Sequence, residues 1–238
     1  MLSIIIPTYQ GSTILNNQLP LLINFLDGHI EEFEIIIVDD GSQDNGKTQD
    51  AANAYNCRYL QNEENLGKGA AVRKGVLAAK GDYIIFTDVD IPFTYNSLEL
   101  FHFYLSFKEF DIVIGDRTLE ESEYFEEISL WRKWGSAFFT FIIGRLVTTG
   151  MFDTQCGLKG FSREVAIDLF SCSKINGFAF DVEILYIALK RNYDIKRLPV
   201  KLRSTEGNSV KLFRHGIIMI KELFNIKWNH VRKRYNAK

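Results

Sequence analysis

The chain lacks the features that identify several common classes of protein. Its three cysteines form no CxxC pair and no zinc-ligand spacing, which favours free thiols in a reducing cytoplasm over disulfides or a zinc site. No apolar run reaches the ~20 residues that a membrane-spanning helix needs, and no signal peptide precedes the strand-like run Leu2–Pro7. The net charge of −2 gives no general reason to expect nucleic-acid binding. We therefore expect a cytoplasmic protein without a transmembrane helix and without a nucleic-acid partner.

Strand-like and helical segments alternate along the first half of the chain. Apolar runs predict strands at Leu2–Pro7, Glu34–Val38, Arg58–Leu60, Tyr83–Thr87 and Ile112–Gly115. Helical periodicity predicts helices at Leu19–Leu26, Thr48–Tyr55, Ala70–Ala79 and Ser97–Phe107, and Gly28 and Gly81 follow two of them as stop signals. The alternation predicts an α/β fold with a mainly parallel sheet and helices on both faces. In the second half we expect helices at Leu130–Val147 and Asp181–Arg191, and a strand at Ile195–Arg203 broken at Pro199.

The C-terminal segment differs from the rest in charge. Residues 211–238 contain eight Lys or Arg and one acidic residue, whereas the remainder of the chain is acidic. Leu212–Trp228 is also apolar at helical spacing, with Phe and Trp beside Lys and Arg, a pattern that favours a membrane interface. The alternative is an ordinary buried helix. We expect a main domain at 1–211 and, at 212–238, a basic amphipathic extension that binds an anionic membrane surface peripherally.

Three polar motifs follow predicted strands. They are Pro7-Thr8-Tyr9, Asp39-Asp40 and Asp88-Val89-Asp90. Ligands of parallel α/β sheets bind beyond the carboxyl ends of the strands, so these motifs are expected to share one site. Two carboxylates separated by one residue can both face a hard divalent cation, Mg²⁺ or Mn²⁺. Each motif taken alone is as well explained by a turn, and it is their convergence that favours a site.

A glycine-rich segment, Asn65-Leu66-Gly67-Lys68-Gly69, leads into the helix predicted at Ala70. Glycines and a lysine at a helix N-terminus can bind an anion. The alternative is a glycine-rich loop with a solvated lysine. The segment matches neither the Walker A pattern nor the Rossmann pattern.

In this order the motifs resemble those of the family 2 glycosyltransferases, which have the nucleotide-sugar-binding GT-A fold. Three downstream segments are similar to those of the polyprenyl-phosphate members of the family, dolichyl-phosphate β-glucosyltransferase and dolichyl-phosphate mannose synthase. These segments are Gly115-Asp116-Arg117, 153–161 (DTQCGLKGF) and 178–185 (FAFDVEIL). The resemblance extends to about Leu212.

The resemblance implies a role for each matching position. The residues implied to bind the nucleotide sugar are Pro7, Tyr9, Asp39, Asp40, Lys68, Asp88, Val89, Arg203, Ser209 and Lys211. Asp88 and Asp90 would hold the metal that bridges the diphosphate. The resemblance implies four catalytic residues. One is Asp90, and the other three, which would receive the acceptor phosphate, are Arg117, Arg132 and Ser136.

Two departures from the family pattern concern the donor. Gln10-Gly11 stands where the family usually has Asn-Glu, so a carboxylate that commonly contacts the base or ribose is absent. Pro92 stands where mannose synthases often carry a third polar residue beside the metal, and water or substrate would have to complete the metal shell.

The implied reaction is inverting transfer of a hexose, with glucose favoured and mannose possible, from UDP-glucose or GDP-mannose to a polyprenyl phosphate. A phosphate acceptor is already ionised and needs positioning, for which arginines are suited. An alternative acceptor, a glycan or protein hydroxyl, would need a general base, and Asp153 and Asp181 are candidates. An alternative of another class is a non-catalytic nucleotide-sugar-binding protein, against which the retained acceptor arginines argue.

Overall fold

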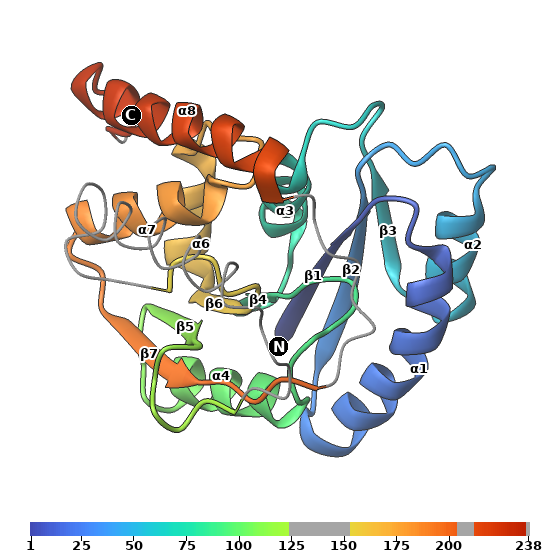
Figure 1. The fold of residues 1–238 in the computed structure, drawn as a ribbon. Helices are drawn as coiled ribbons and strands as arrows, with labels where there is room; N and C mark the ends of the chain where they lie inside the picture. Colours follow the sequence, from blue (N-terminus) through green and yellow to red (C-terminus); the bar gives the residue numbers. More distant parts are fainter. Residues whose placement is uncertain (124–152, 204–211, 237–238) are drawn as a thin grey trace.

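The computed structural model describes residues 1–123, 153–203 and 212–236, and these residues form a mixed sheet with helices on both faces (Figure 1). The strands are β1 (Leu2–Thr8), β2 (Phe33–Asp39), β3 (Arg58–Gln61), β4 (Tyr83–Phe86), β5 (Ile112–Asp116), β6 (Lys159–Ser162) and β7 (Ile195–Pro199). The helices are α1 (Ser12–His29), α2 (Lys47–Ala54), α3 (Lys68–Ala78), α4 (Asn96–Ser106), α6 (Arg163–Cys172), α7 (Phe180–Lys190) and α8 (Leu212–Val231).

The strand order is β3-β2-β1-β4-β6-β5-β7. Every neighbouring pair is parallel except those of β6, which runs antiparallel to both β4 and β5. The predicted α/β class and mainly parallel sheet are therefore confirmed. Strand β6 and helix α6 were not predicted from the sequence. The four residues of β6 include a glycine and a lysine, so they show neither an apolar run nor alternation.

Burial on both faces explains why the central strands are continuous apolar runs. Along β1, Ile5 packs with the helices of one face and Ile4 and Ile6 with those of the other, and all three are fully buried. Helices α3, α6 and α7 cover the first face, and α1, α2 and α4 cover the second (Figure 1). Each strand residue thus buries apolar surface whichever way it points, as in other parallel sheets.

Of the two glycines predicted to follow helices as stop signals, only Gly81 lies beyond its helix. Helix α1 begins at Ser12 and ends at His29, so Gly28 lies inside the helix and is not a stop signal. Gly81 lies beyond the end of α3, but its neighbours give it a packing role. A Cβ atom at Gly81 would come within 2.7 Å of the Ser3 nitrogen on β1.

Helix α8 packs against α7 and completes the core on that side (Figure 1). Met219, Leu223 and Ile226 are buried in the same cluster as the residues of α7. Beyond the helix, the Tyr235 hydroxyl donates to Glu183 at 2.6 Å. Residues assigned from sequence to an extension thus contribute to the core, and the domain boundary at 211/212 stays a prediction. The helix predicted at Leu130–Val147 lies outside the described residues.

A buried ion pair links β6 to α7. The Lys159 ammonium group, fully buried, donates to Asp181 at 2.7 Å and to the Cys156 carbonyl at 2.7 Å. Asp181 is itself only 4% exposed. Burial raises the pKa of Asp181 in spite of the neighbouring lysine charges. The lysine in β6 is therefore a core residue whose partner lies 22 positions away.

Replacing Lys159 with Met should lower the free energy of unfolding by about 3–5 kcal/mol, because Asp181 would be left as an unpaired buried charge. The loss, measured by urea denaturation against wild type at each pH, should shrink on acidification. A carboxyl group with a raised folded-state pKa binds a proton more readily when folded than when unfolded, so acid favours the folded variant. Lys80→Met, at an exposed lysine, is the control and should change stability little. Equal effects of the two substitutions would contradict the pairing argument.

Candidate active site

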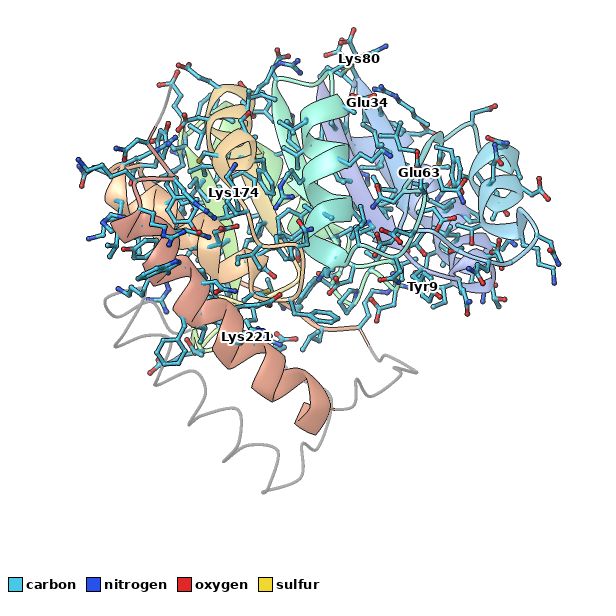
Figure 2. The ribbon with its side chains drawn as sticks, turned by 90° about the horizontal axis from the view of Figure 1, so that it is seen from above. Tyr9, Glu34, Glu63, Lys80, Lys174 and Lys221 are labelled. Atoms are coloured by element: carbon cyan, nitrogen blue, oxygen red, sulfur yellow. The ribbon has the colours of Figure 1, made fainter. Side chains whose placement is uncertain are left out.

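The three predicted motifs meet at one end of the sheet. Strands β1 and β2 end at Thr8 and Asp39, and β4 ends at Phe86, two residues before Asp88. Figure 2 shows Tyr9 at the opposite end of the sheet from Glu34 and Lys80, which mark the amino ends of β2 and β4. The carboxyl ends of these strands thus form the candidate site, as predicted from the order of the motifs.

Asp39 is a buried acceptor within the site wall. Its side chain, 1% exposed, accepts hydrogen bonds from the Ser42 backbone and hydroxyl at 3.0 and 2.5 Å, and from the Tyr59 hydroxyl at 2.7 Å. Ser42 in turn accepts a hydrogen bond from the Gln10 nitrogen at 2.6 Å. Asp39 therefore joins the loop after β2 to the segment after β1. Tyr9, next to Gln10, is 49% exposed and lies at the rim of the site.

Asp40 holds the glycine-rich segment. Its carboxylate, in a residue 5% exposed, accepts hydrogen bonds from the Leu66 and Gly67 nitrogens at 3.0 and 2.7 Å and from the Asn62 amide at 2.8 Å. Gly67 has a φ of 107°, a conformation that a residue with a side chain rarely adopts. Asp40 thus fixes the point at which α3 begins. It thereby also fixes the position of Lys68, the residue that follows Gly67.

Lys68 brings a positive charge to the metal motif. Its ammonium group lies 2.5 Å from Asp88, at the N-terminus of α3. Burial alone would lower the pKa of Lys68, but the charges of Asp88, Asp181 and Asp90 outweigh burial and raise it. Lys68 is therefore held as a cation at the end of β4, as expected for a group that meets an anionic ligand.

Asp88 and Asp90 are close enough to influence one another. Burial, followed by the charge of Asp88, raises the pKa of Asp90. Such a pair of carboxylates fits a hard divalent cation, which would relieve their repulsion. Among residues 1–123, 153–203 and 212–236, no group of three or more His, Cys, Asp or Glu forms a complete metal site. The two carboxylates could therefore supply only part of a coordination shell, and water or substrate oxygens would supply the rest.

Gly157 makes room for the Asp88 carboxylate, a role not predicted from the sequence. A Cβ atom at Gly157 would lie 2.0 Å from Asp88 Oδ2, so any side chain there would displace the carboxylate. The only signal was the position of Gly157 in the DTQCG segment. The hydroxyls of Thr8 and Thr87, at the ends of β1 and β4, were also not singled out. Both are buried and have no hydrogen-bond partner in the part of the chain that the structure describes.

Arg117 is held by the first residue of the DTQCG segment. Its guanidinium group donates two hydrogen bonds to Asp153, at 2.9 and 2.7 Å, and its backbone nitrogen donates a third at 2.7 Å. Burial would raise the pKa of Asp153, but the bonds and charge of Arg117 lower it overall. The pair fixes the arginine at the end of β5, and its contact with an acceptor phosphate stays a prediction.

Arg203 lies against the segment that follows the metal motif, despite its distance from that segment in sequence. Its backbone nitrogen donates to the Pro92 carbonyl at 2.7 Å, and its guanidinium carbon is 4.5 Å from the centre of the Tyr95 ring. The segment after β7 therefore runs along the segment that follows Asp90. Pro7 and Val89 lie at the same end of the sheet, on β1 and between the two aspartates. The other predicted site residues, Arg132, Ser136, Ser209 and Lys211, lie outside the described residues.

Comparison with solved structures shows that the fold is shared with two sugar-3-phosphoglycerate synthases, one of which was solved with a bound nucleotide. Mannosyl-3-phosphoglycerate synthase from Rubrobacter xylanophilus superposes with a TM-score of 0.71 at 17% identity, over 100% of this chain and 76% of that one. Glucosyl-3-phosphoglycerate synthase from Mycobacterium tuberculosis, solved with Mn²⁺, uridine diphosphate and glucosyl-3-phosphoglycerate, superposes with a TM-score of 0.68 at 16% identity, over 100% of this chain and 81% of that one. The predicted GT-A fold is confirmed by these neighbours.

Sequence comparison identifies the family. The dolichyl-phosphate beta-glucosyltransferase of Dictyostelium discoideum is 32% identical over 246 residues, which cover 97% of this chain and 75% of that protein. The protein of the same name from Mus musculus is 30% identical over 254 residues, which cover 100% of this chain and 78% of that protein. The family model described as glycosyl transferase family 2 matches residues 3–170. The chain therefore belongs to glycosyl transferase family 2 and is related along nearly its whole length to the dolichyl-phosphate β-glucosyltransferases.

Proposed function

We propose that the protein is an inverting glycosyltransferase that moves glucose from UDP-glucose to a polyprenyl phosphate at a membrane surface. The observation that carries the proposal is the gathering of Lys68, Asp88 and Asp90 at the carboxyl edge of the sheet, in a chain 32% identical to a dolichyl-phosphate beta-glucosyltransferase. A negatively charged leaving group, the nucleoside diphosphate, needs this combination of fixed positive charge and metal-binding oxygens.

The donor would lie across the carboxyl ends of β1, β2 and β4. Tyr9, half exposed at the rim, would cover the nucleobase, while the Asp39 and Asp40 networks hold the surrounding loops in place. Lys68 and Arg203 would donate to the diphosphate and stabilise the charge that develops as the sugar leaves. A divalent ion held by Asp88 and Asp90, Mn²⁺ or Mg²⁺, would supply further positive charge to the leaving group.

The pairing of two aspartates favours a phosphate acceptor over a hydroxyl. Asp153 is committed to Arg117, which lowers its pKa and makes it a poor base. Asp181 is 4% exposed and paired with Lys159. Both candidates for a general base thus have structural partners, whereas a phosphate oxygen needs no base and only has to be positioned. Arg117, held rigidly by Asp153, would be one of the groups that position it, with Arg132 and Ser136 as the predicted others.

Glucose and UDP are favoured over mannose and GDP because the matching relatives are named glucosyltransferases. The M. tuberculosis fold neighbour was crystallised with Mn²⁺, UDP-glucose and phosphoglyceric acid, which shows that the same fold accommodates this donor. Gln10 replaces the usual family residue, and its backbone nitrogen donates to Ser42, which ties this segment to the Asp39 network.

One side of α8 suits a membrane surface. Phe224, Trp228 and Val231 recur at helical spacing on this side and are 71%, 54% and 72% exposed. Lys221 and Lys227 lie beside them along the helix, Arg232 directly follows its last residue, and all three are exposed. None of the helices within the described ranges has the length and apolar character to cross a bilayer. An exposed apolar stripe with basic edges, on a helix anchored by its opposite side, is the pattern of a peripheral helix on an anionic leaflet. We place it on the cytoplasmic leaflet.

The proposed reaction is tested with a panel of nucleotide sugars, a polyprenyl phosphate, and Mn²⁺ or Mg²⁺, with products read by mass spectrometry. A hexosyl-phosphate lipid should form with UDP-glucose as the best donor. Asp90→Asn should lower turnover by about 100-fold or more, because one charge of the metal motif is lost. Asp27→Asn, at an exposed aspartate on α1, is the matched control and should keep full activity. Transfer to a glycan hydroxyl, or full activity in the presence of a chelator, would contradict the proposal.

Gly157→Ala should weaken the metal site without unfolding the protein. The added methyl group would occupy space 2.0 Å from Asp88 Oδ2, so the carboxylate must turn away. We expect the apparent Mn²⁺ affinity, measured from the metal dependence of rate and by electron paramagnetic resonance with UDP present, to fall by about tenfold or more. Gly28→Ala is the control, because no atom lies within 4 Å of its added methyl group. Unchanged Mn²⁺ affinity in Gly157→Ala would show that Asp88 does not bind the metal.

Phe224→Ser combined with Trp228→Ser should release the protein from vesicles of anionic phospholipid, because two exposed apolar side chains no longer enter the interface. Substitution is a cleaner test than deletion of the segment, since α8 also carries the buried residues Met219 and Leu223. Co-sedimentation measures the loss, and turnover on a water-soluble short-chain acceptor should be retained. Leu100→Ser with Phe103→Ser, at partly exposed positions on α4, provides the control. Equal sedimentation of wild type and the α8 variant would contradict the membrane assignment.

A further inference from the structure

An open pocket of about 360 Å³ lies between the C-terminal ends of α7 and α8, formed by elements other than those of the candidate active site. Its lining residues include Tyr186, Lys190, Arg191, His230, Tyr235 and Asn236. The lining thus combines aromatic rings with basic side chains and contains no carboxylate. A pocket of this composition is suited to an anion rather than to a metal ion or a neutral molecule.

Two lysines from different helices approach one aromatic ring, that of Tyr186, which lines this pocket together with Lys190. The ammonium groups of Lys227 on α8 and Lys190 on α7 lie 4.9 and 5.8 Å from the centre of the Tyr186 ring. The His230 ring packs edge-on against the same ring, with centroids 5.4 Å apart. The buried Tyr186 side chain therefore acts as a common platform for three basic residues.

The charge of this cluster is not balanced within the described part of the chain. Neither Lys190 nor Lys227 forms an ion pair with a carboxylate there, whereas the neighbouring Arg191 is bonded to Asp168. Burial, and then the charge of Lys190, lowers the pKa of Lys227, as expected where a second positive charge approaches the same ring. The C-terminal end of α7 explains a lysine at position 190. It does not explain a second lysine brought to the same ring by α8.

We propose that this pocket binds the phosphate group of an anionic membrane lipid. Two ammonium groups offer the donors that phosphate oxygens accept, and the arriving charge would relieve the repulsion between the lysines. The lipid assignment follows from the position of Lys227 on α8, three residues after Phe224 and four before Val231, which places it beside the exposed stripe of Phe224, Trp228 and Val231. A lipid whose acyl chains lie along that stripe would place its headgroup near the pocket. The inference rests on the proposed membrane association, but not on the identity of the donor or the acceptor.

The test compares two double variants that remove the same charge from α8 and its surroundings. Lys190→Gln with Lys227→Gln removes both ammonium groups at the Tyr186 ring. Lys221→Gln with Arg232→Gln removes two basic groups that neither line the pocket nor approach that ring. Binding is measured by co-sedimentation with vesicles of phosphatidylcholine alone and with phosphatidylglycerol or phosphatidic acid added. We expect the pocket variant to lose affinity for the anionic vesicles by about tenfold more than the control variant. Equal losses would mean diffuse attraction only and would overturn the proposal.

A second experiment distinguishes binding of a lipid headgroup from binding of a soluble phosphate. Inorganic phosphate and glycerol 3-phosphate are titrated without vesicles and followed by isothermal calorimetry. Weak binding, abolished in the pocket variant and much weaker than vesicle binding, supports the lipid assignment. Binding of inorganic phosphate that is as tight as vesicle binding would assign the pocket to a free anion and overturn it. Turnover on a water-soluble short-chain acceptor should be equal in wild type and both variants. If the wild-type protein proves inactive but the two variants still differ tenfold in vesicle binding, only the proposed reaction is rejected and the pocket assignment stands.

Discussion

The position of the Asp88 carboxylate is the constraint on which the candidate site depends. Lys68 approaches it to 2.5 Å, and Gly157 leaves the space that it occupies. Lys68 is aimed there because Asp40 holds the nitrogen of the preceding Gly67. The segments of Lys68 and Gly157 therefore meet at one carboxylate, and Asp40 holds the first of them in place. A carboxylate so constrained can accept a metal ion with little rearrangement, which is how a preorganised site lowers the free energy of a transition state.

The sheet was predictable because its strands are buried on both faces. Runs such as Leu2–Thr8 remain apolar throughout, and no other local structure explains them as well. Strand β6 could not be predicted for the opposite reason. Its Lys159 is tolerated in the core only because Asp181, on a helix that follows later in the chain, neutralises it. Local pattern carries no information about such a partner, and the same holds for Gly81, whose neighbour Ser3 lies 78 positions earlier in the chain.

The site was predictable in location but not in the division of roles. The ends of parallel strands must lie together, so motifs after β1, β2 and β4 had to meet. Adjacent aspartates, by contrast, look alike in sequence. Only the structure shows that Asp39 binds Ser42 and Tyr59 whereas Asp40 binds the glycine-rich segment. The pairing of Arg117 with Asp153 could not be predicted either, because the sequence does not show whether an arginine or an aspartate binds another side chain or a ligand.

Hydrogen bonds to the backbone link helix α8 to the candidate site by way of the segment before α7. Glu222 on α8 accepts a hydrogen bond from the Ala179 nitrogen at 3.1 Å, at the start of α7. Three residues earlier, the Asn176 carbonyl accepts one from the Ala70 nitrogen at 3.2 Å, in the first turn of α3, which also carries Lys68. These short, partly buried links leave little freedom for α8 to move independently of the α3 N-terminus. If α8 lies on a membrane as proposed, its orientation also sets the orientation of Lys68 and Asp88 relative to that surface. A lipid phosphate at the interface would then meet a site whose orientation relative to the membrane is fixed by the packing of α8, whereas a flexible tether would leave that orientation variable.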